Sequence, residues 1–191
     1  MRVNGKQTRT VWMEEGTVVM INQPLLPHSF ELVRFDDFRK TAAAIKTMVV
    51  RGAGAIGATG AYAVAQAAIE GAALPTTVDF RAFMEEASTV IANTRPTAQN
   101  LFYGIAQVMA SVHKALDAEQ TPQQAATAAC IAAQAVADED AQSCRRIGAH
   151  GSRLITPGAR VATHCNAGWL AFVDWGSALS PVYAAYEEGK D

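Results

Sequence analysis

The stretch Val161-Ala-Thr-His-Cys-Asn-Ala-Gly168 lies near the C-terminal end of the sequence. Its first three residues are typical of a short buried strand, and Pro157-Gly158 before them are typical of a turn. Gly168 permits a sharp change of direction, and the apolar spacing from Trp169 to Leu179 predicts a helix. The stretch therefore predicts one strand–helix unit of an open α/β sheet.

The residues His164, Cys165 and Asn166 fall where the predicted strand ends. Ligands of open α/β sheets bind at the carboxyl ends of the strands, so a thiol, an imidazole and a carboxamide here indicate a chemical site. The alternative is an ordinary turn with a small buried cysteine. We expect His164 to be structural, because side chains alternate along extended backbone and His164 would face away from Cys165.

Composition narrows the class of protein. The chain has 191 residues, 16 basic and 18 acidic side chains and a formal charge of -2, without a long basic cluster. Nucleic acid and membrane surfaces are therefore not expected as partners. No apolar run approaches the roughly 18 residues of a membrane span, and the N-terminus lacks the apolar region of a secretory signal. The cysteines form no CxxC pair, which predicts a reduced, cytoplasmic protein without a metal site.

The chain before the strand–helix unit is predicted to be a small β-rich segment followed by helices. Strand patterns occupy Thr10–Trp12, Thr17–Ile21 and Phe30–Val33. Helical patterns follow at about 37–49, 51–69, 80–93, 98–116 and 123–148, and Asp79 is a candidate cap for the third of them.

The predicted fold class is α+β passing into α/β, with domain bounds at 1–35 for the β-rich segment, 36–155 for the helical part and 156–191 for the strand–helix unit. One strand and one helix cannot bury each other, so we expect the sequence to stop inside its last domain. The open strand edges and the apolar helix face would then favour a homodimer or a second chain that supplies the remaining strands.

The segment Arg51-Gly-Ala-Gly-Ala-Ile-Gly57 opens a helix of small residues. Glycines recur every three residues, at Gly54, Gly57 and Gly60, which fits either close helix packing or a helix N-terminus whose bare amides bind an anion. Arg51 directly before the helix favours the anion, because its guanidinium adds charge to the amides and the dipole. The pattern is not GxGxxG and follows no long strand, so a dinucleotide site is not predicted.

Two further charged groups are ambiguous. Arg95 falls in the break Thr94-Arg-Pro-Thr97 between two predicted helices, where it is either a binding group or a solvated surface arginine. The acidic run Asp138-Glu-Asp140 is interpreted as a solvated helix face rather than a metal site.

Three motifs in order resemble one family. Met48–Gly57, Thr94–Leu101 and Thr163–Gly168 together resemble the methylthioribose-1-phosphate isomerases, which belong with the α, β and δ subunits of translation initiation factor 2B. The likeness extends over nearly the whole chain. It implies an N-terminal helical domain with a small β element, followed by the beginning of a Rossmann-like parallel α/β domain. It also implies conversion of 5-methylthioribose 1-phosphate to 5-methylthioribulose 1-phosphate in methionine salvage, without metal or nucleotide cofactor.

The resemblance also implies roles for five residues. Arg51, Gly52 and Ala53 would bind the phosphate of the small phosphosugar, Arg95 would be a second binding group, and Cys165 would be the catalytic cysteine. We expect Arg51, Arg95 and Cys165 to share one cleft.

Departures from the family pattern limit the inference. The family usually has Pro at the position of Gly54 and Asp at the position of Asn22. Its catalytic Asp and a downstream Asn-Lys pair match no residue here, so the chain is expected to lack the C-terminal part and to be inactive by itself. The alternatives are a ribose-1,5-bisphosphate type of isomerase or a non-catalytic, initiation factor 2B-like regulatory binding protein.

Overall fold

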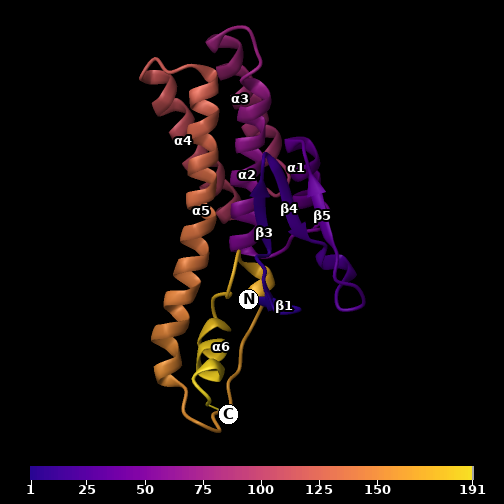
Figure 1. Ribbon diagram of the computed structural model, residues 1–191, viewed down its shortest axis with the longest axis vertical. Helices are drawn as coiled ribbons and strands as arrows, with labels where there is room; N and C mark the ends of the chain where they lie inside the picture. The colour runs from indigo at the N-terminus through magenta and orange to yellow at the C-terminus, as the bar shows by residue number, and fades with distance from the viewer. Residues whose placement is uncertain (191) are drawn as a thin grey trace.

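The small-residue helix α2 (Ala53–Gly71) is the centre of the fold. It packs against α1 (Phe38–Lys46), α3 (Thr77–Ala92), α4 (Gln99–Asp117) and α5 (Pro122–Gly151) in a computed structural model that describes residues 1–190 (Figure 1). Glycine on α2 allows its neighbours to approach closely, because a Cβ added to Gly57 would lie 2.8 Å from the carbonyl oxygen of Asn100. The five predicted helices are confirmed.

The helix caps follow from short polar side chains. Asp37 caps α1, where its carboxylate accepts from the amides of Arg39 and Lys40, and Thr121 with Gln124 forms a capping box at α5. The prediction that Asp79 caps α3 is wrong. Thr76 is the cap, and the Asp79 amide donates to its hydroxyl over 3.1 Å, because Asp79 lies inside the first turn.

A three-stranded antiparallel sheet covers one side of the helices. Its order is β3 (Val11–Glu14), β4 (Thr17–Ile21), β5 (Leu32–Phe35), and the first two strands are joined by Glu15-Gly16, both with positive φ. β4 is buried from Val18 to Ile21, and it contacts α2. The predicted strands are confirmed with bounds shifted by one or two residues, and a short hairpin of β1 (Arg2–Val3) and β2 (Lys6–Gln7) was not predicted.

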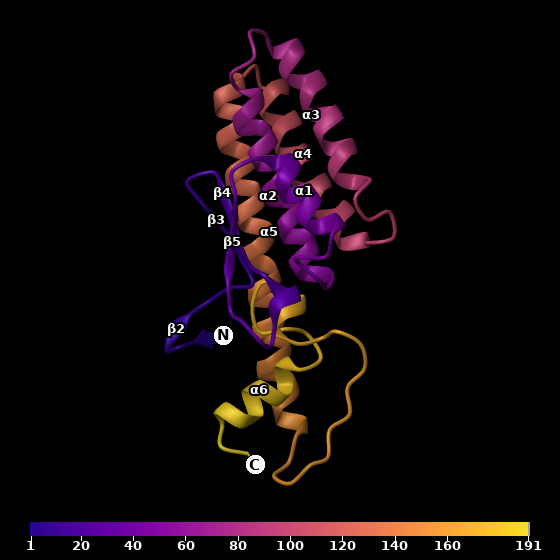
Figure 2. The same cartoon turned by 90° about the vertical axis from the view of Figure 1, so that its right-hand side faces the viewer.

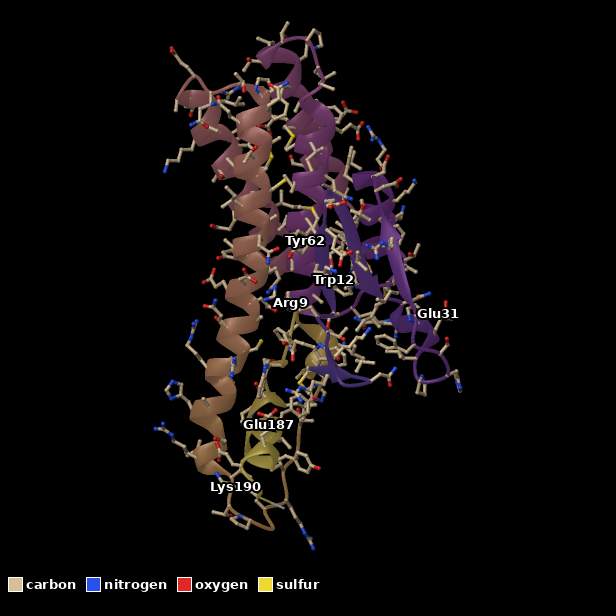
Figure 3. The ribbon with its side chains drawn as sticks, viewed as in Figure 1. Arg9, Trp12, Glu31, Tyr62, Glu187 and Lys190 are labelled. Atoms are coloured by element: carbon tan, nitrogen blue, oxygen red, sulfur yellow. The ribbon has the colours of Figure 1, made fainter. Side chains whose placement is uncertain are left out.

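A polar network ties the N-terminal segment to the helices. The Arg9 guanidinium donates to Asp138 over 2.6 Å, Gln134 donates to the same carboxylate over 3.0 Å, and the Tyr62 hydroxyl donates to Gln134 over 3.1 Å. Figure 3 labels Arg9 and Tyr62, the two ends of this network. Burial raises the pKa of Tyr62, so its hydroxyl stays a hydrogen-bond donor. The network joins Arg9, two residues before β3, to α5 and α2.

The C-terminal segment differs from the prediction. After α5 and the short 3-10 helix η2 (Ser152–Leu154), the backbone of 155–168 loops away from the helices, and Val161–Thr163 form no strand (Figure 2). A parallel strand needs a neighbouring strand to complete its hydrogen-bond ladder, and within residues 1–190 no strand pairs with Val161–Thr163.

The predicted helix at 169–179 is also wrong. A 3-10 helix, η3 (Trp169–Ala171), is followed by irregular backbone and then by α6 (Ser180–Glu187). Positive φ angles of 68° at Trp175 and 80° at Gly176 interrupt the expected helix.

Helix α6 docks on the lower end of α5, beside which it lies in Figure 1. The Ser180 hydroxyl donates to the carbonyl oxygen of Cys144 over 2.7 Å, and two glycines of α5, Gly148 and Gly151, leave room for Ser180 and Pro181. The helical domain with a small β element is thus confirmed, whereas the division at 35 and 155 stays a prediction. Within residues 1–190, no helix is both long and apolar enough to cross a membrane.

Candidate active site

The start of α2 is shaped by glycine. Gly52 has φ of 91° and precedes the first helical residue, Ala53. A Cβ at Gly52 would overlap the backbone of Ala171, with its carbonyl oxygen only 2.6 Å away, so the position needs glycine for both conformation and space. No side chain caps α2, which leaves its first amides and the positive end of a 19-residue helix for an anion.

Arg51 stands directly before these amides. Its side chain is exposed, and Nε donates to the carbonyl oxygen of Met48 over 3.2 Å, which holds the guanidinium at the turn. Within the described part of the chain Arg51 forms no ion pair, so its outer nitrogens stay available to a ligand.

Arg95 lies in the turn between α3 and α4, as predicted. Its side chain is half-buried, and its carbonyl oxygen accepts from the amide of Ala98 over 3.1 Å. Because Gly57 of α2 lies against Asn100 of α4, and Gly60 against Leu101, the two helices begin at the same end of the bundle. The two arginines therefore precede neighbouring helix starts.

Cys165 lies in the exposed segment 155–168 with φ of 68°. The other two cysteines are on α5, where burial raises the pKa of Cys144 to about 12 and also raises the pKa of Cys130. Cys165 is thus the one exposed thiol of the three. Among residues 1–190 no hydrogen bond or ion pair joins Cys165 to Arg51 or Arg95, so the shared cleft stays a prediction.

The structure brings the start of α2 against the residues that follow the cysteine motif, although the side chains of Arg51, Arg95 and Cys165 do not take part in this contact. Gly52 contacts Ala171, which follows Cys165 by six positions, and a Cβ at Gly54 would lie 2.5 Å from the ring of Phe172. The segment that follows the cysteine motif therefore packs directly on the start of α2.

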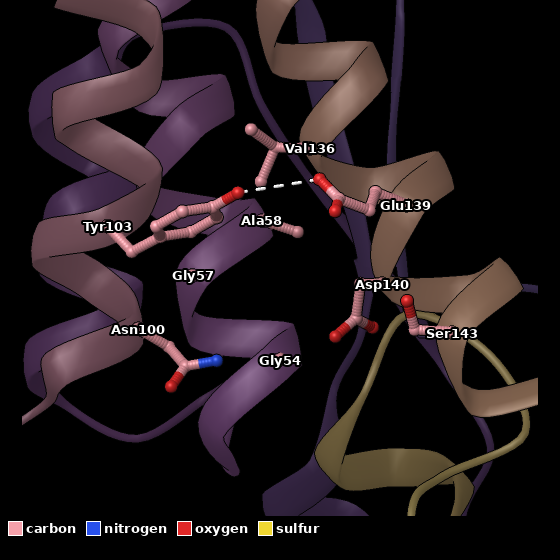
Figure 4. Close-up of a pocket in the computed structure, with 9 residues that line it drawn as sticks. All are labelled: Gly54, Gly57, Ala58, Asn100, Tyr103, Val136, Glu139, Asp140 and Ser143. Carbon is pink, nitrogen blue, oxygen red and sulfur yellow. Dashed lines mark hydrogen bonds between the residues drawn. The ribbon is translucent and has the colours of Figure 1, made fainter. Parts of the chain in front are cut away.

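A polar cleft of about 240 Å³ opens beside this junction, between α2, α4 and α5 (Figure 4). Gly54 and Gly57 form its floor, and its polar side chains are Asn100, Tyr103, Glu139, Asp140 and Ser143. Burial raises the pKa of Asp140 to about 6, although the amide of Val173, which donates to its carboxylate, acts in the opposite direction.

Sequence reasoning missed Asp140, because the acidic run around it was interpreted as solvated. The signal was its spacing: Asp140 lies three residues after buried Ala137 and four before buried Cys144, on the inner stripe of α5. No group of three or more His, Cys, Asp or Glu side chains in residues 1–190 is arranged to hold a metal ion.

Known proteins share this sequence and fold. The chain is 42% identical to methylthioribose-1-phosphate isomerase of Methylorubrum populi over 99% of its own length and 51% of that protein. It is 41% identical to the Roseiflexus castenholzii protein of the same name, over 95% of this chain and 52% of that one. The chain thus spans about half the length of the curated relatives it matches.

Two crystal structures agree with these relatives. The 5-methylthioribose 1-phosphate isomerase of Pyrococcus horikoshii superposes with a TM-score of 0.88 at 36% identity, over 97% of this chain and 51% of that one. The subunit delta of translation initiation factor eIF-2B from A. fulgidus superposes with a TM-score of 0.85 at 36% identity, over 96% and 52%. The model of the initiation factor 2 subunit family, IF-2B, matches residues 49–191, and the chain belongs to that family.

Proposed function

We propose that the whole protein is an aldose–ketose isomerase that converts 5-methylthioribose 1-phosphate to 5-methylthioribulose 1-phosphate in methionine salvage. The isomerases at 41–42% identity support this reaction. The observation that carries it is the packing of Gly52, at the uncapped start of α2, against Ala171 in the segment that follows Cys165.

In this proposal the phosphate binds at the start of α2. Arg51 supplies a guanidinium, Gly52 and Ala53 supply backbone amides at the positive end of the helix, and Arg95 supplies a second cation from the start of α4. A phosphate dianion suits two arginines and a helix N-terminus, because each contact is charge-assisted. Asp140 lies beside Gly54, and no hydrogen bond of residues 1–190 joins its carboxylate to these first amides.

Cys165 is the proposed proton-transfer group. The isomerisation opens the sugar ring and moves a hydrogen from C2 to C1, and the exposed thiol of Cys165 is free to meet the sugar. A second proton-transfer group is needed to serve the sugar oxygens, and none of the five assigned residues fills that role.

A non-catalytic regulatory protein that binds a phosphosugar is the second candidate. The eIF-2B subunit delta supports it, because its identity of 36% equals that of the isomerase structure. A regulatory subunit has no use for Cys165, so turnover distinguishes the two candidates. Under either function we propose a cytoplasmic homodimer with domain bounds near residues 35 and 155.

The test is the variant Cys165→Ser in the whole protein, assayed with 5-methylthioribose 1-phosphate. We expect kcat to fall by about 10³-fold or more while KM changes less than about threefold, because the phosphate site is untouched. Cys130→Ala is the matched control and should keep wild-type kinetics. An effect on KM alone would limit Cys165 to shaping the pocket, and a wild-type protein that binds the phosphosugar without turnover would favour the regulatory candidate.

A further inference from the structure

The loop 49–54 and the segment 169–173 carry no hydrogen bond to each other in the part of the chain that the structure describes. They meet only through van der Waals contact, of Gly52 with Ala171 and of Gly54 with Phe172. Because individual van der Waals contacts are weak, directional hydrogen bonds from residues outside both segments can fix their register.

Gln23 is one such group. It is buried, with 7% of its surface exposed, although its side chain is polar. Its backbone amide donates to the carbonyl oxygen of Val49 over 3.3 Å, and its side-chain Nε2 donates to the carbonyl oxygen of Leu170 over 2.8 Å. Gln23 thus bonds both to Val49, two residues before Arg51, and to Leu170 in the middle of η3.

Asp140 is the other, on the side of α5. Its Oδ2 accepts from the amide of Val173 over 2.7 Å. The rest of the carboxylate fills the space beside Gly54, where an added Cβ would lie 2.8 Å from the carboxylate carbon. Asp140 therefore contacts the same two segments as Gln23, but at later residues, Gly54 in the first and Val173 in the second.

We propose that Gln23 and Asp140 are positioning residues that hold the loop carrying Arg51 in fixed register with the segment that follows Cys165. The inference rests on the proposed function, in which the first segment binds the phosphate and the second continues from the motif that contains Cys165. Neither side chain needs to touch the substrate. A shift of about 1 Å between a binding group and a reacting group is enough to slow a reaction strongly.

Thr10 provides a matched control. Its hydroxyl donates to the carbonyl oxygen of Trp169 over 3.3 Å and its amide donates to Val173, but it makes no hydrogen bond to the loop 49–54. Thr10→Val therefore loosens one segment without releasing the register. Asp140→Asn is the conservative variant, because its carboxamide oxygen still accepts from Val173.

The first arm of the test needs no ligand. Hydrogen exchange is measured on peptides 49–60 and 169–175 of the 191-residue chain. In Gln23→Leu and Asp140→Leu we expect both peptides to exchange about tenfold faster, because each variant loses its side-chain hydrogen bond to 169–173 and, with it, the link through that residue to 49–54. Asp140→Asn should exchange no faster than the wild type, and Thr10→Val should change peptide 169–175 alone. A change confined to one peptide in both leucine variants would overturn the proposal.

The second arm measures isomerase kinetics of the whole protein, per folded molecule and well below each variant's Tm. We expect Asp140→Leu and Gln23→Leu to lower kcat about tenfold with KM within about threefold, and Asp140→Asn to restore kcat. A kcat per folded molecule equal to that of the wild type would show a merely structural role and would overturn the positioning role. Absence of turnover in the wild type would instead refute the proposed function, while the exchange arm still decides the register.

Discussion

Asp140 is the one carboxyl group of residues 1–190 whose pKa is raised by burial, to about 6. A raised pKa means that the folded protein holds the proton at pH values where the unfolded chain has released it. The contribution of Asp140 to folding stability therefore falls as pH rises from about 4 to about 6 and levels off above that window. The exposed carboxyl groups Glu14, Asp36 and Glu188 have lowered pKa values and act in the opposite direction.

The variant Asp140→Asn isolates this contribution. We expect its urea-unfolding free energy to lack the decrease between pH 4 and 6, a difference from the wild type of up to about 3 kcal/mol for two pKa units and less where the carboxyl meets solvent. Glu139→Gln, on the exposed neighbour, is the control and should keep the wild-type slope. Equal slopes in Asp140→Asn and the wild type would contradict the raised pKa.

The second prediction at the residue scale concerns the effect of Gly52 on stability. Gly52→Ala places a Cβ on a residue with φ of 91° and against the backbone of Ala171, so we expect a loss of about 2–4 kcal/mol in unfolding free energy. Gly158→Ala also places a Cβ on a residue with positive φ, 75°, but this Cβ would have no neighbour within 4 Å. It should cost only the backbone strain, about 1 kcal/mol. Similar losses in the two variants would show that contact with Ala171 does not matter.

At the scale of elements, the docking of α6 on α5 depends on a glycine. Gly148→Ala would normally favour a helix by about 1 kcal/mol. Here the new Cβ would lie 2.8 Å from Oγ and 3.0 Å from the carbonyl oxygen of Ser180, so we expect the sign to reverse and α6 to loosen. Hydrogen exchange of 180–187 should accelerate more than that of 122–140.

The double variant Gly148→Ala/Ser180→Ala checks the cause. Removal of the hydroxyl should recover part of the loss, because the overlap with Oγ disappears while that with the carbonyl oxygen remains. Strict additivity of the two single variants would show that Gly148 and Ser180 are not coupled.

The same scale shows what the sequence could predict. The helices were predictable because each has its own apolar stripe and start signal, as in α5 with Thr121-Pro122. The strand at Val161 and the helix after it were not, since a strand depends on a partner and the positive φ of Trp175 breaks the helix. Local motifs indicated Arg51 and Cys165, whereas Gln23 and Asp140 join residues more than 25 positions apart and carry no local signal.

At the scale of the whole molecule, the helical bundle is well packed, whereas the segment 159–166 forms neither helix nor strand and is exposed. The Val161 side chain is 53% exposed, and its neighbours in 159–166 are exposed as well. Apart from the Ala159 amide, which donates to the carbonyl oxygen of Thr156, the backbone groups of 159–166 make no hydrogen bond within the described chain, so they are free to pair with a strand from another chain as a sheet edge does. The bundle has its own core and does not need this pairing.

The 191-residue chain should therefore self-associate through 159–166, which sedimentation equilibrium across a range of concentrations would detect. Ala162→Pro removes one amide donor and should weaken the association constant by about tenfold or more. Leu154→Ser is the control, since Leu154 is 86% exposed but lies outside the extended segment. Hydrogen exchange at 161–163 should be fast in the dilute monomer and slower at high concentration. A monomer at every concentration would refute pairing, and a stronger effect of Leu154→Ser than of Ala162→Pro would assign the contact to apolar side chains rather than to the backbone.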